Sequence, residues 1–128
     1  MRPCSPRDRG AAVAEFALVA AMVVLLFVGA LQLGYALHVR NTATAHVIEG
    51  ARAGSRVGST PADGAARAVE LLRTTLPGRR VTDVSASETT VGGVRVVEVS
   101  ARVPLPVLGP FGPPGAMTVT GHAYQEDQ

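Results

Sequence analysis

The sequence contains no tryptophan and no lysine, and its 128 residues include one cysteine, two tyrosines and three phenylalanines. Beyond residue 37 the only aromatic residues are Phe111 and Tyr124. A core of valine, alanine and leucine buries modest apolar area, so we expect the soluble part of the chain to be marginally stable alone. Cys4 cannot form an internal disulfide, and no apolar stretch precedes it as in a lipoprotein signal.

The basic charge is confined to the start of the chain. All twelve cationic side chains are arginines; three lie within residues 1–10, whereas residues 11–128 contain nine arginines and nine acids. No basic stripe with interleaved aromatic residues is present, so we expect no nucleic-acid partner. Hydrophobic residues make up 47% and charged residues 17%, which excludes wholesale disorder, and the length fits one small domain.

A long apolar run occupies residues 16–37, where Gln32 is the only strongly polar side chain and no residue is charged. As a helix this run spans about 33 Å, the thickness of a bilayer's hydrocarbon core. A chain this small could not surround such a helix, so the run predicts membrane insertion. Tyr35, His38 and Arg40 at its far end are typical of interfacial anchors.

These features predict three segments: a basic leader over residues 1–10, a transmembrane helix over 11–37, and a small extracytoplasmic α+β domain over 38–128. Arginine counts on the two sides of the helix tie, but a short basic segment before the first apolar helix usually stays in the cytoplasm. We therefore expect a single-pass protein of the cytoplasmic membrane, with its N-terminus inside and its C-terminal domain outside.

Two alternatives remain open. The first is a secretory signal peptide, whose apolar region normally runs 7–15 residues and ends at a small-x-small site. The present run is longer, although Gly34-Tyr35-Ala36 is an acceptable cleavage site that would release a secreted binding domain. The second alternative is a signal-anchored envelope protein that scaffolds other complexes.

Glu15 lies where the chain would enter the membrane, five positions after Gly10. An ionised carboxylate costs about 2.5–3.5 kcal/mol at the centre of a bilayer, so it should have a partner. If the chain is cut after Gly10, the new α-ammonium group of Ala11 lies one helical turn away and can pair with Glu15, within one subunit or between neighbours. The alternative is an interfacial glutamate that extends to the headgroups or takes up a proton.

These residues carry a resemblance to a known family. The basic leader, Gly10, the glutamate five positions later and the immediate apolar helix resemble the prepilin signal of type IV pilins and pseudopilins. The pair Glu15-Phe16 resembles the TadE-like branch of Tad (Flp, type IVb) pilus systems. After the membrane segment, Glu49-Gly50-Ala51-Arg52 is similar to the Glu-Gly-Ala-Arg run of TadE-like proteins, although Ile48 stands where another arginine is expected.

The resemblance implies a role and partners. A membrane prepilin peptidase would cut between Gly10 and Ala11, and Glu15 with Phe16 would guide docking to other Tad pilins or pseudopilins and to the assembly platform. The chain would then be a minor pilin or pseudopilin that helps to assemble a Tad-type pilus for surface attachment, located in the membrane or in the extracellular pilus.

The rest of the sequence predicts two further helical stretches. Residues 38–57 continue as an amphipathic helix with a stripe of small and apolar residues, in which Gly50 and Gly54 permit close approach of another element. We expect this pair to pack against the protein's own sheet rather than to form a dimer contact. Glu49 and Arg52 are spaced for a surface ion pair. The stripe is Val39, Ala43, Val47, Gly50, Gly54 and Val57.

Thr60 is a good N-cap for the second helix, with Pro61 at its first position, Asp63 at its third, and Pro77-Gly78 at its end. Its predicted inner stripe is Ala62, Ala65, Ala66, Val69, Leu72 and Leu76.

A three-stranded antiparallel sheet follows in the prediction. Its strands are residues 81–88, residues 94–103 after a turn at Gly92-Gly93, and residues 117–124, with a stiff loop rich in proline and glycine over 104–115. A long N-terminal helix, a short helix and such a sheet make a membrane-anchored α+β fold. This element order is compatible with the pilin-like fold that the resemblance implies.

No pattern in the sequence predicts catalysis or a cofactor. His38, His46 and His122 are scattered without metal-ligand spacing, and Gly92-Gly93 lacks the residues of a phosphate loop. No nucleophile elbow or paired-carboxylate signature is present. We therefore expect a non-enzyme with no metal, no cofactor and no small-molecule substrate.

Overall fold

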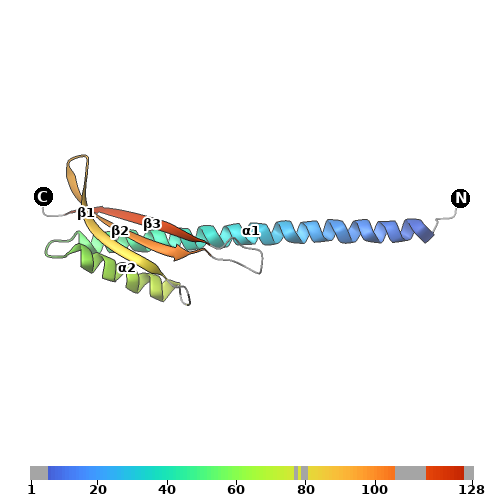
Figure 1. Cartoon of the computed structure of the whole chain (residues 1–128), viewed down its shortest axis with the longest axis horizontal. Coiled ribbons are helices and arrows are strands. Elements are labelled where there is room, and N and C mark those ends of the chain that lie inside the picture. The colour runs from blue at the N-terminus through green and yellow to red at the C-terminus, as the bar shows by residue number, and fades with distance from the viewer. Residues whose placement is uncertain (1–5, 77, 79–80, 106–114, 126–128) are drawn as a thin grey trace. The chain divides into compact units, whose positions relative to one another are not determined.

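The structure, a computed structural model, describes residues 6–76, 78, 81–105 and 115–125. Their element order is α1, α2, β1, β2, β3, a pilin-like α+β arrangement as predicted (Figure 1). The helices are α1 (Pro6–Gly54) and α2 (Pro61–Thr75), and the strands are β1 (Thr82–Val91), β2 (Val94–Pro104) and β3 (Ala116–Tyr124).

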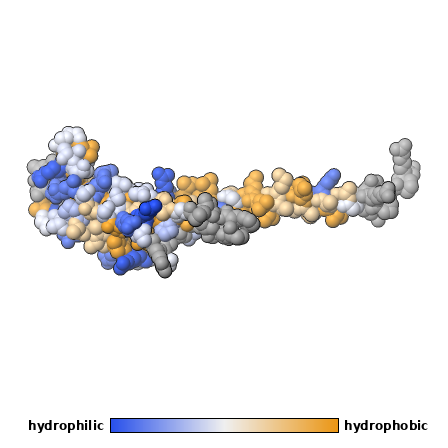
Figure 2. All heavy atoms as spheres, viewed as in Figure 1, coloured by the Kyte–Doolittle hydropathy of each residue, from blue (hydrophilic) through white to orange (hydrophobic). Residues whose placement is uncertain are grey.

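The chain divides into two compact units, residues 1–34 and 35–128. The division falls within α1, which is continuous from Pro6 to Gly54. In the first unit, the described residues form this helix, and Figure 2 shows hydrophobic residues along it. The second unit holds the rest of α1, the second helix and the sheet.

In the second unit β2 is the central strand, paired antiparallel with β1 on one side and with β3 on the other. The hairpin from β1 to β2 turns at Gly92 and Gly93, whose φ angles are 61° and 83°. A two-residue turn with both φ angles positive matches the twist of the strands, and glycine adopts it without strain. The sequence-based prediction of a turn at this pair is confirmed.

One face of the sheet packs against both helices and forms the hydrophobic core. Alternate residues of β2 from Val97 to Val103 are fully buried, as their alternation predicts. No member of this core cluster is aromatic, so the interior is built from small and medium aliphatic side chains. The cluster is Val39, Ala43, Val47 and Ala51 of α1, Ala68, Leu72 and Leu76 of α2, Val97, Val99, Ala101 and Val103 of β2, and Val119 of β3.

Glycines bring α1 and α2 into backbone contact. A Cβ atom added to Gly50 would lie 2.7 Å from the carbonyl oxygen of Gly64 and 2.8 Å from the Cβ of Ala68, and one added to Gly54 would lie 3.2 Å from the Cα of Gly64. The sequence-based prediction that Gly50 and Gly54 pack against the sheet is therefore wrong in its partner. They do pack within the protein, but against α2, because only another small residue leaves room for this approach.

A third close contact joins α1 to the sheet. A Cβ atom added to Gly121 of β3 would lie 2.6 Å from the backbone nitrogen of Ile48 and 2.8 Å from the carbonyl carbon of Val47. A glycine inside a strand often marks such a backbone approach. Gly121 therefore lets β3 lie directly on α1.

The start of α2 follows the sequence-based prediction. Thr60 is the N-cap, Pro61 opens the helix, and the Asp63 amide donates to Thr60 Oγ1 over 3.3 Å while the Thr60 amide donates to Asp63 Oδ2 over 2.8 Å. This reciprocal capping box satisfies two backbone donors. The hydrogen bonds from the Thr60 hydroxyl and amide lower the pKa of Asp63, because they favour its charged form.

The predicted inner stripe of α2 is wrong in most of its members. Leu72 and Leu76 are buried as expected, but the remaining buried positions are Gly64 and Ala68. The predicted members Ala62 and Ala66 are exposed, and Ala65 and Val69 are partly exposed. The helix rotates in this way because Gly64 and Ala68 are the residues that fit against the glycines of α1.

Two element boundaries also differ from the prediction, each by three residues. Helix α1 ends at Gly54 rather than at residue 57, since the chain turns back there to bring α2 alongside, and Val57 is exposed. Strand β1 runs to Val91, three residues beyond its predicted end, because it pairs with β2 up to the turn. The last two strands start and end within a residue of their predicted limits. Most of the predicted loop, with Phe111, lies outside the described residues.

We predict that Gly50→Ala destabilises the second unit although alanine is the better helix former. The added methyl group meets the backbone of Gly64, and overpacking of this kind costs about 1–3 kcal/mol, against about 1 kcal/mol gained in helix propensity. Hydrogen exchange of the β2 amides in the full chain, held in detergent micelles, measures the free energy of unfolding.

The matched control for this substitution is Gly34→Ala in the same helix, where the new methyl group meets no atom within 4 Å. We expect exchange of the β2 amides to be unchanged by it. Equal effects of the two substitutions would contradict the packing role of Gly50.

Candidate functional site

The predicted processing and docking residues all lie on α1 in the first unit. Gly10, Ala11, Glu15 and Phe16 are exposed, and Phe16 exposes 76% of its surface. The bond between Gly10 and Ala11 lies within the helix, so a protease, which needs an extended backbone, would have to unwind this turn. The pairing of Glu15 stays a prediction.

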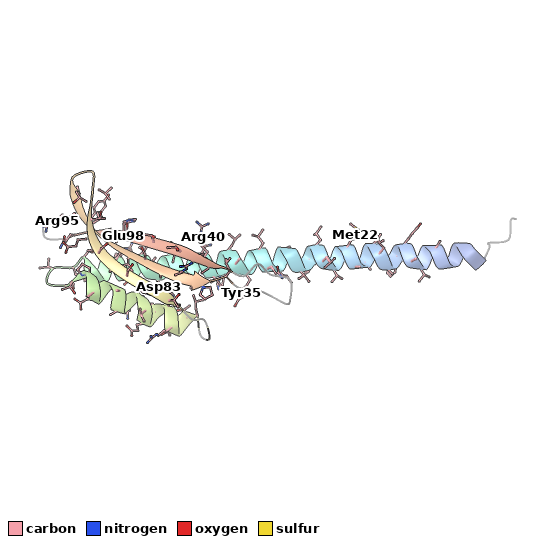
Figure 3. All side chains as sticks on the ribbon, in the orientation of Figure 1. Met22, Tyr35, Arg40, Asp83, Arg95 and Glu98 are labelled. Atoms are coloured by element: carbon pink, nitrogen blue, oxygen red, sulfur yellow. The ribbon has the colours of Figure 1, made fainter. Side chains whose placement is uncertain are left out.

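The apolar part of α1 is uncovered. Its most apolar stretch has none of its surface buried, and the helix from Gly10 to Gly54 is long and apolar enough to cross a membrane. Met22 is one of the projecting apolar side chains (Figure 3). A membrane anchor and a signal sequence both have these properties, and the orientation of the helix stays a prediction.

The Glu-Gly-Ala-Arg run lies in the last two turns of α1, in the second unit, and its four residues have different environments. Gly50 contacts α2, Ala51 is fully buried in the core, Glu49 is partly buried and Arg52 is exposed. The predicted ion pair between Glu49 and Arg52 does not form, since neither side chain has an ion-pair partner among the described residues. Two members of the run therefore serve packing, while Arg52 is available at the surface.

Arg52 lines a polar hollow of about 550 Å³ between the end of α1 and the end of β3. Its lining consists of Arg52, Ser55, Arg56, His122, Ala123 and Tyr124. Ser55 is almost fully buried and donates a hydrogen bond from its hydroxyl to the carbonyl oxygen of Arg52 over 3.0 Å, which fixes the turn after the helix. The hollow is thus lined by two cationic side chains.

A second hollow, of about 350 Å³, adjoins the same end of β3. It shares His122, Ala123 and Tyr124 with the first hollow and adds Val91 and Val96. Val96 alternates with the core residue Val97, so it lies on the opposite sheet face, and it is nevertheless 97% buried. This second hollow is mainly apolar.

The histidines of the second unit make separate polar contacts. His122 and Glu98 are cross-strand partners on the exposed face of the sheet, with Nε2 and Oε2 2.7 Å apart (Figure 3 labels Glu98). His46 of α1 shares a hydrogen bond of 3.0 Å with the hydroxyl of Thr75 at the end of α2. Partial burial lowers the pKa of His46, because the charged form loses solvation. Among the described residues, no three metal-ligating side chains gather in one place.

Sequence reasoning missed both of these contacts and both hollows. The pairing of His122 with Glu98 depends on the register of β2 and β3, and that of His46 with Thr75 on the packing of two helices; neither is encoded in local spacing. Gly121 gave one usable signal, since a lone glycine within a strand indicates close backbone approach.

Comparison with known protein families gives a match. A family model described as TadE-like protein matches residues 10–52, from the predicted processing residue to the end of the Glu-Gly-Ala-Arg run. Over these residues the chain is similar to the TadE-like family. Comparisons with curated proteins and with solved structures give no match. The matched segment lies within α1: it comprises the apolar stretch and the part of the helix that packs against the sheet. Strands β1–β3 lie beyond the match.

We predict that His46 makes the stability of the second unit depend on pH. Its pKa is lowered below 6.5 in the folded state, so the unfolded chain binds more protons at mildly acidic pH. The stabilisation is complete above pH 6.5 and is lost as the pH falls from there through the lower folded pKa. Hydrogen exchange of the β2 amides between about pH 7.5 and about pH 5 measures the loss, after correction for intrinsic exchange rates.

The variant His46→Gln isolates this contribution, because glutamine keeps a hydrogen-bonding group without titrating, and His38 and His122 remain in both proteins. We expect a flatter pH profile in the variant. Parallel profiles would contradict the role of His46.

Proposed function

We propose that the chain is a minor pilin or pseudopilin of a Tad-type (type IVb) pilus, used for surface attachment. The observation that carries the proposal is the TadE-like match over residues 10–52. The matched residues include Gly10, Glu15 and the Glu-Gly-Ala-Arg run, all of which lie in α1. Similarity to the TadE-like family supports association with a Tad pilus. The specific role as a non-enzymatic subunit, with pilins and the assembly platform as partners, is our inference.

The proposed chain is anchored in the cytoplasmic membrane by residues 11–37, with the basic residues 1–10 inside and residues 38–128 outside. The exposed apolar side chains of the first unit support this placement, because water is a poor solvent for such a surface. A bilayer of about 30 Å covers roughly twenty of these residues. Tyr35 lies near the far end of the apolar stretch and Arg40 just beyond it, where interfacial anchors belong (Figure 3).

Glu15 is the residue proposed to direct assembly. In lipid a carboxylate without a partner is costly, and processing after Gly10 creates an amine four residues before it. Pairing with the amine of a neighbouring subunit stabilises association and fixes the axial position of the two helices. Phe16 would then contribute apolar contact beside the ion pair, since its side chain projects freely from α1.

One observation favours a second candidate, a secreted binding domain released after Ala36. The compact second unit begins at Tyr35, and the first residue of its core is Val39. A cut after Ala36 would therefore remove no core side chain. The size of the processed chain distinguishes the two candidates.

We predict that the chain purified from its native membrane begins at Ala11, because a peptidase removes residues 1–10. Intact-mass measurement and N-terminal sequencing identify the terminus. Gly10→Val should leave the chain uncut, since a β-branched residue hinders the extended backbone that the peptidase needs. The same substitution at Gly29, which also has open space around it, should leave processing unchanged.

Other termini have defined meanings. A chain that begins after Ala36 supports the secreted domain and contradicts the pilin. An intact Met1 in assembled pili contradicts processing and leaves a membrane-anchored role.

We predict that Glu15→Ala abolishes pilus assembly while the chain still inserts into the membrane. Loss of one intramembrane ion pair, worth about 1–2 kcal/mol, reduces association about tenfold at each subunit contact. Electron microscopy of sheared pili and membrane fractionation measure the two effects. The control is Glu70→Ala, which removes an exposed acid that pairs with Arg67 on α2. Normal piliation in the Glu15 variant would exclude the proposed role of this carboxylate.

A further inference from the structure

The two edges of the sheet differ in how they are protected. Strand β1 is irregular near its start, where the register shifts between Thr82 and Ser85 and Asp83 adopts a φ of 55°. Such a bulge twists an edge strand away from regular pairing. Strand β3 pairs with β2 over nine consecutive residues with no shift, and it contains no proline, lysine, arginine or acid. Among the described residues β3 is paired on one side only.

The β3 edge is also held rigidly. Gly121, in the middle of the C-terminal half of β3, lies against the backbone of Val47 and Ile48 on α1. A strand fixed in this way offers backbone donors and acceptors at a constant spacing, which is the requirement for adding a further strand. The outer edge of β3 is therefore a template for an extended segment.

The two hollows at the end of β3 indicate which side chains such a segment carries. The polar hollow includes Arg52 of α1 and Arg56 just after this helix, so its two arginines come from the helix side of the sheet, and its lining contains no carboxylate. Neither guanidinium has an ion-pair partner among the described residues. The apolar hollow includes Val91 and Val96, and Val96 belongs to the opposite face.

We propose that the outer edge of β3 binds an extended acidic segment of a partner protein as a fourth strand. Successive side chains of a strand point to opposite faces of a sheet. An acidic residue of the segment therefore reaches Arg52 and Arg56, and the adjacent apolar residue fills the hollow at Val96 and Tyr124. The partner is recognised by alternating acidic and apolar residues. This proposal goes beyond the pilin function and requires neither cleavage at Gly10 nor pairing of Glu15.

The chain's own residues Glu126 and Asp127 are the competing occupant, because they come two and three residues after the end of β3 and carry the complementary charge. If these two acidic residues paired with Arg52 and Arg56, neutralising the acids would free the arginines to bind the peptide. This outcome is included in the test.

The experiment uses the full chain in zwitterionic detergent micelles and a fluorescent peptide of about seven residues, the length of a typical strand, in which glutamate and valine alternate. Fluorescence anisotropy measures binding, and hydrogen exchange reports on the β3 amides. We expect saturable binding that slows exchange in β3 but leaves β1 unchanged. A lysine–valine peptide should not bind, and a glutamate–valine peptide with N-methylated amides on its pairing edge should lose the interaction because it cannot donate to β3.

Matched arginine variants test the charge. Arg52→Gln with Arg56→Gln should weaken binding about tenfold. Each exposed ion pair strengthens binding by up to about threefold, and the two effects multiply. Arg73→Gln with Arg102→Gln removes the same charge from exposed positions outside both hollows and should leave binding unchanged. Glu126→Gln with Asp127→Asn should bind the peptide no more tightly than the original chain.

Several results would overturn the proposal. Equal binding of the N-methylated peptide would exclude strand addition, and equal losses in the two arginine pairs would exclude a site at Arg52 and Arg56. A gain of about tenfold on neutralising Glu126 and Asp127 would assign the site to the chain's own end. No binding of the glutamate–valine peptide, with the fold intact by hydrogen exchange, would also refute it. None of these results bears on the processing of Gly10, so the pilin proposal stands or falls separately.

Discussion

The second unit depends on backbone-to-backbone contact at glycine. Gly50 and Gly54 meet Gly64 of α2 on one side of α1, and Gly121 of β3 meets the helix on another side. With no aromatic residue in the core cluster, large side chains cannot fill the space between elements. The elements instead approach until small residues touch, and close packing of this kind recovers dispersion energy that a looser interior would lose. A methyl group at any of these contacts would push the backbones of the two contacting elements apart.

This constraint also gives a physical meaning to the TadE-like run. Gly50 and Ala51 belong to the contacts that hold α2 and the sheet, and Arg52 is the next residue on the helix. The short run thereby couples packing to surface charge: the small residues fix the helix in place, and the arginine emerges at a defined point beside β3. The environments of these motif residues differ because this turn of α1 lies at the boundary between the core and the surface.

Much of the fold could be predicted from local patterns. The alternation of valine in β2, the Gly92-Gly93 turn and the Thr60 cap each have one structural solution, and all three are confirmed. The inner face of α2 could not be found in this way, because alanine occurs on every side of that helix and gives no directional preference. What selects the face is a contact with glycines that lie ten or more residues earlier, and hydrophobicity carries no information about it. The hollows beside β3 were out of reach for the same reason, since they arise where two distant segments meet.

The core cluster of the described residues contains no aromatic side chain, and this has an optical consequence. Tyr35 and Tyr124 expose 40% and 70% of their surfaces, and the chain has no tryptophan. Neither ring is immobilised among core side chains, so ultraviolet absorbance and intrinsic emission change little when the interior comes apart. Unfolding of the core therefore gives almost no intrinsic fluorescence signal. A single tryptophan introduced beside the core would report on unfolding with no other tryptophan emission to interfere.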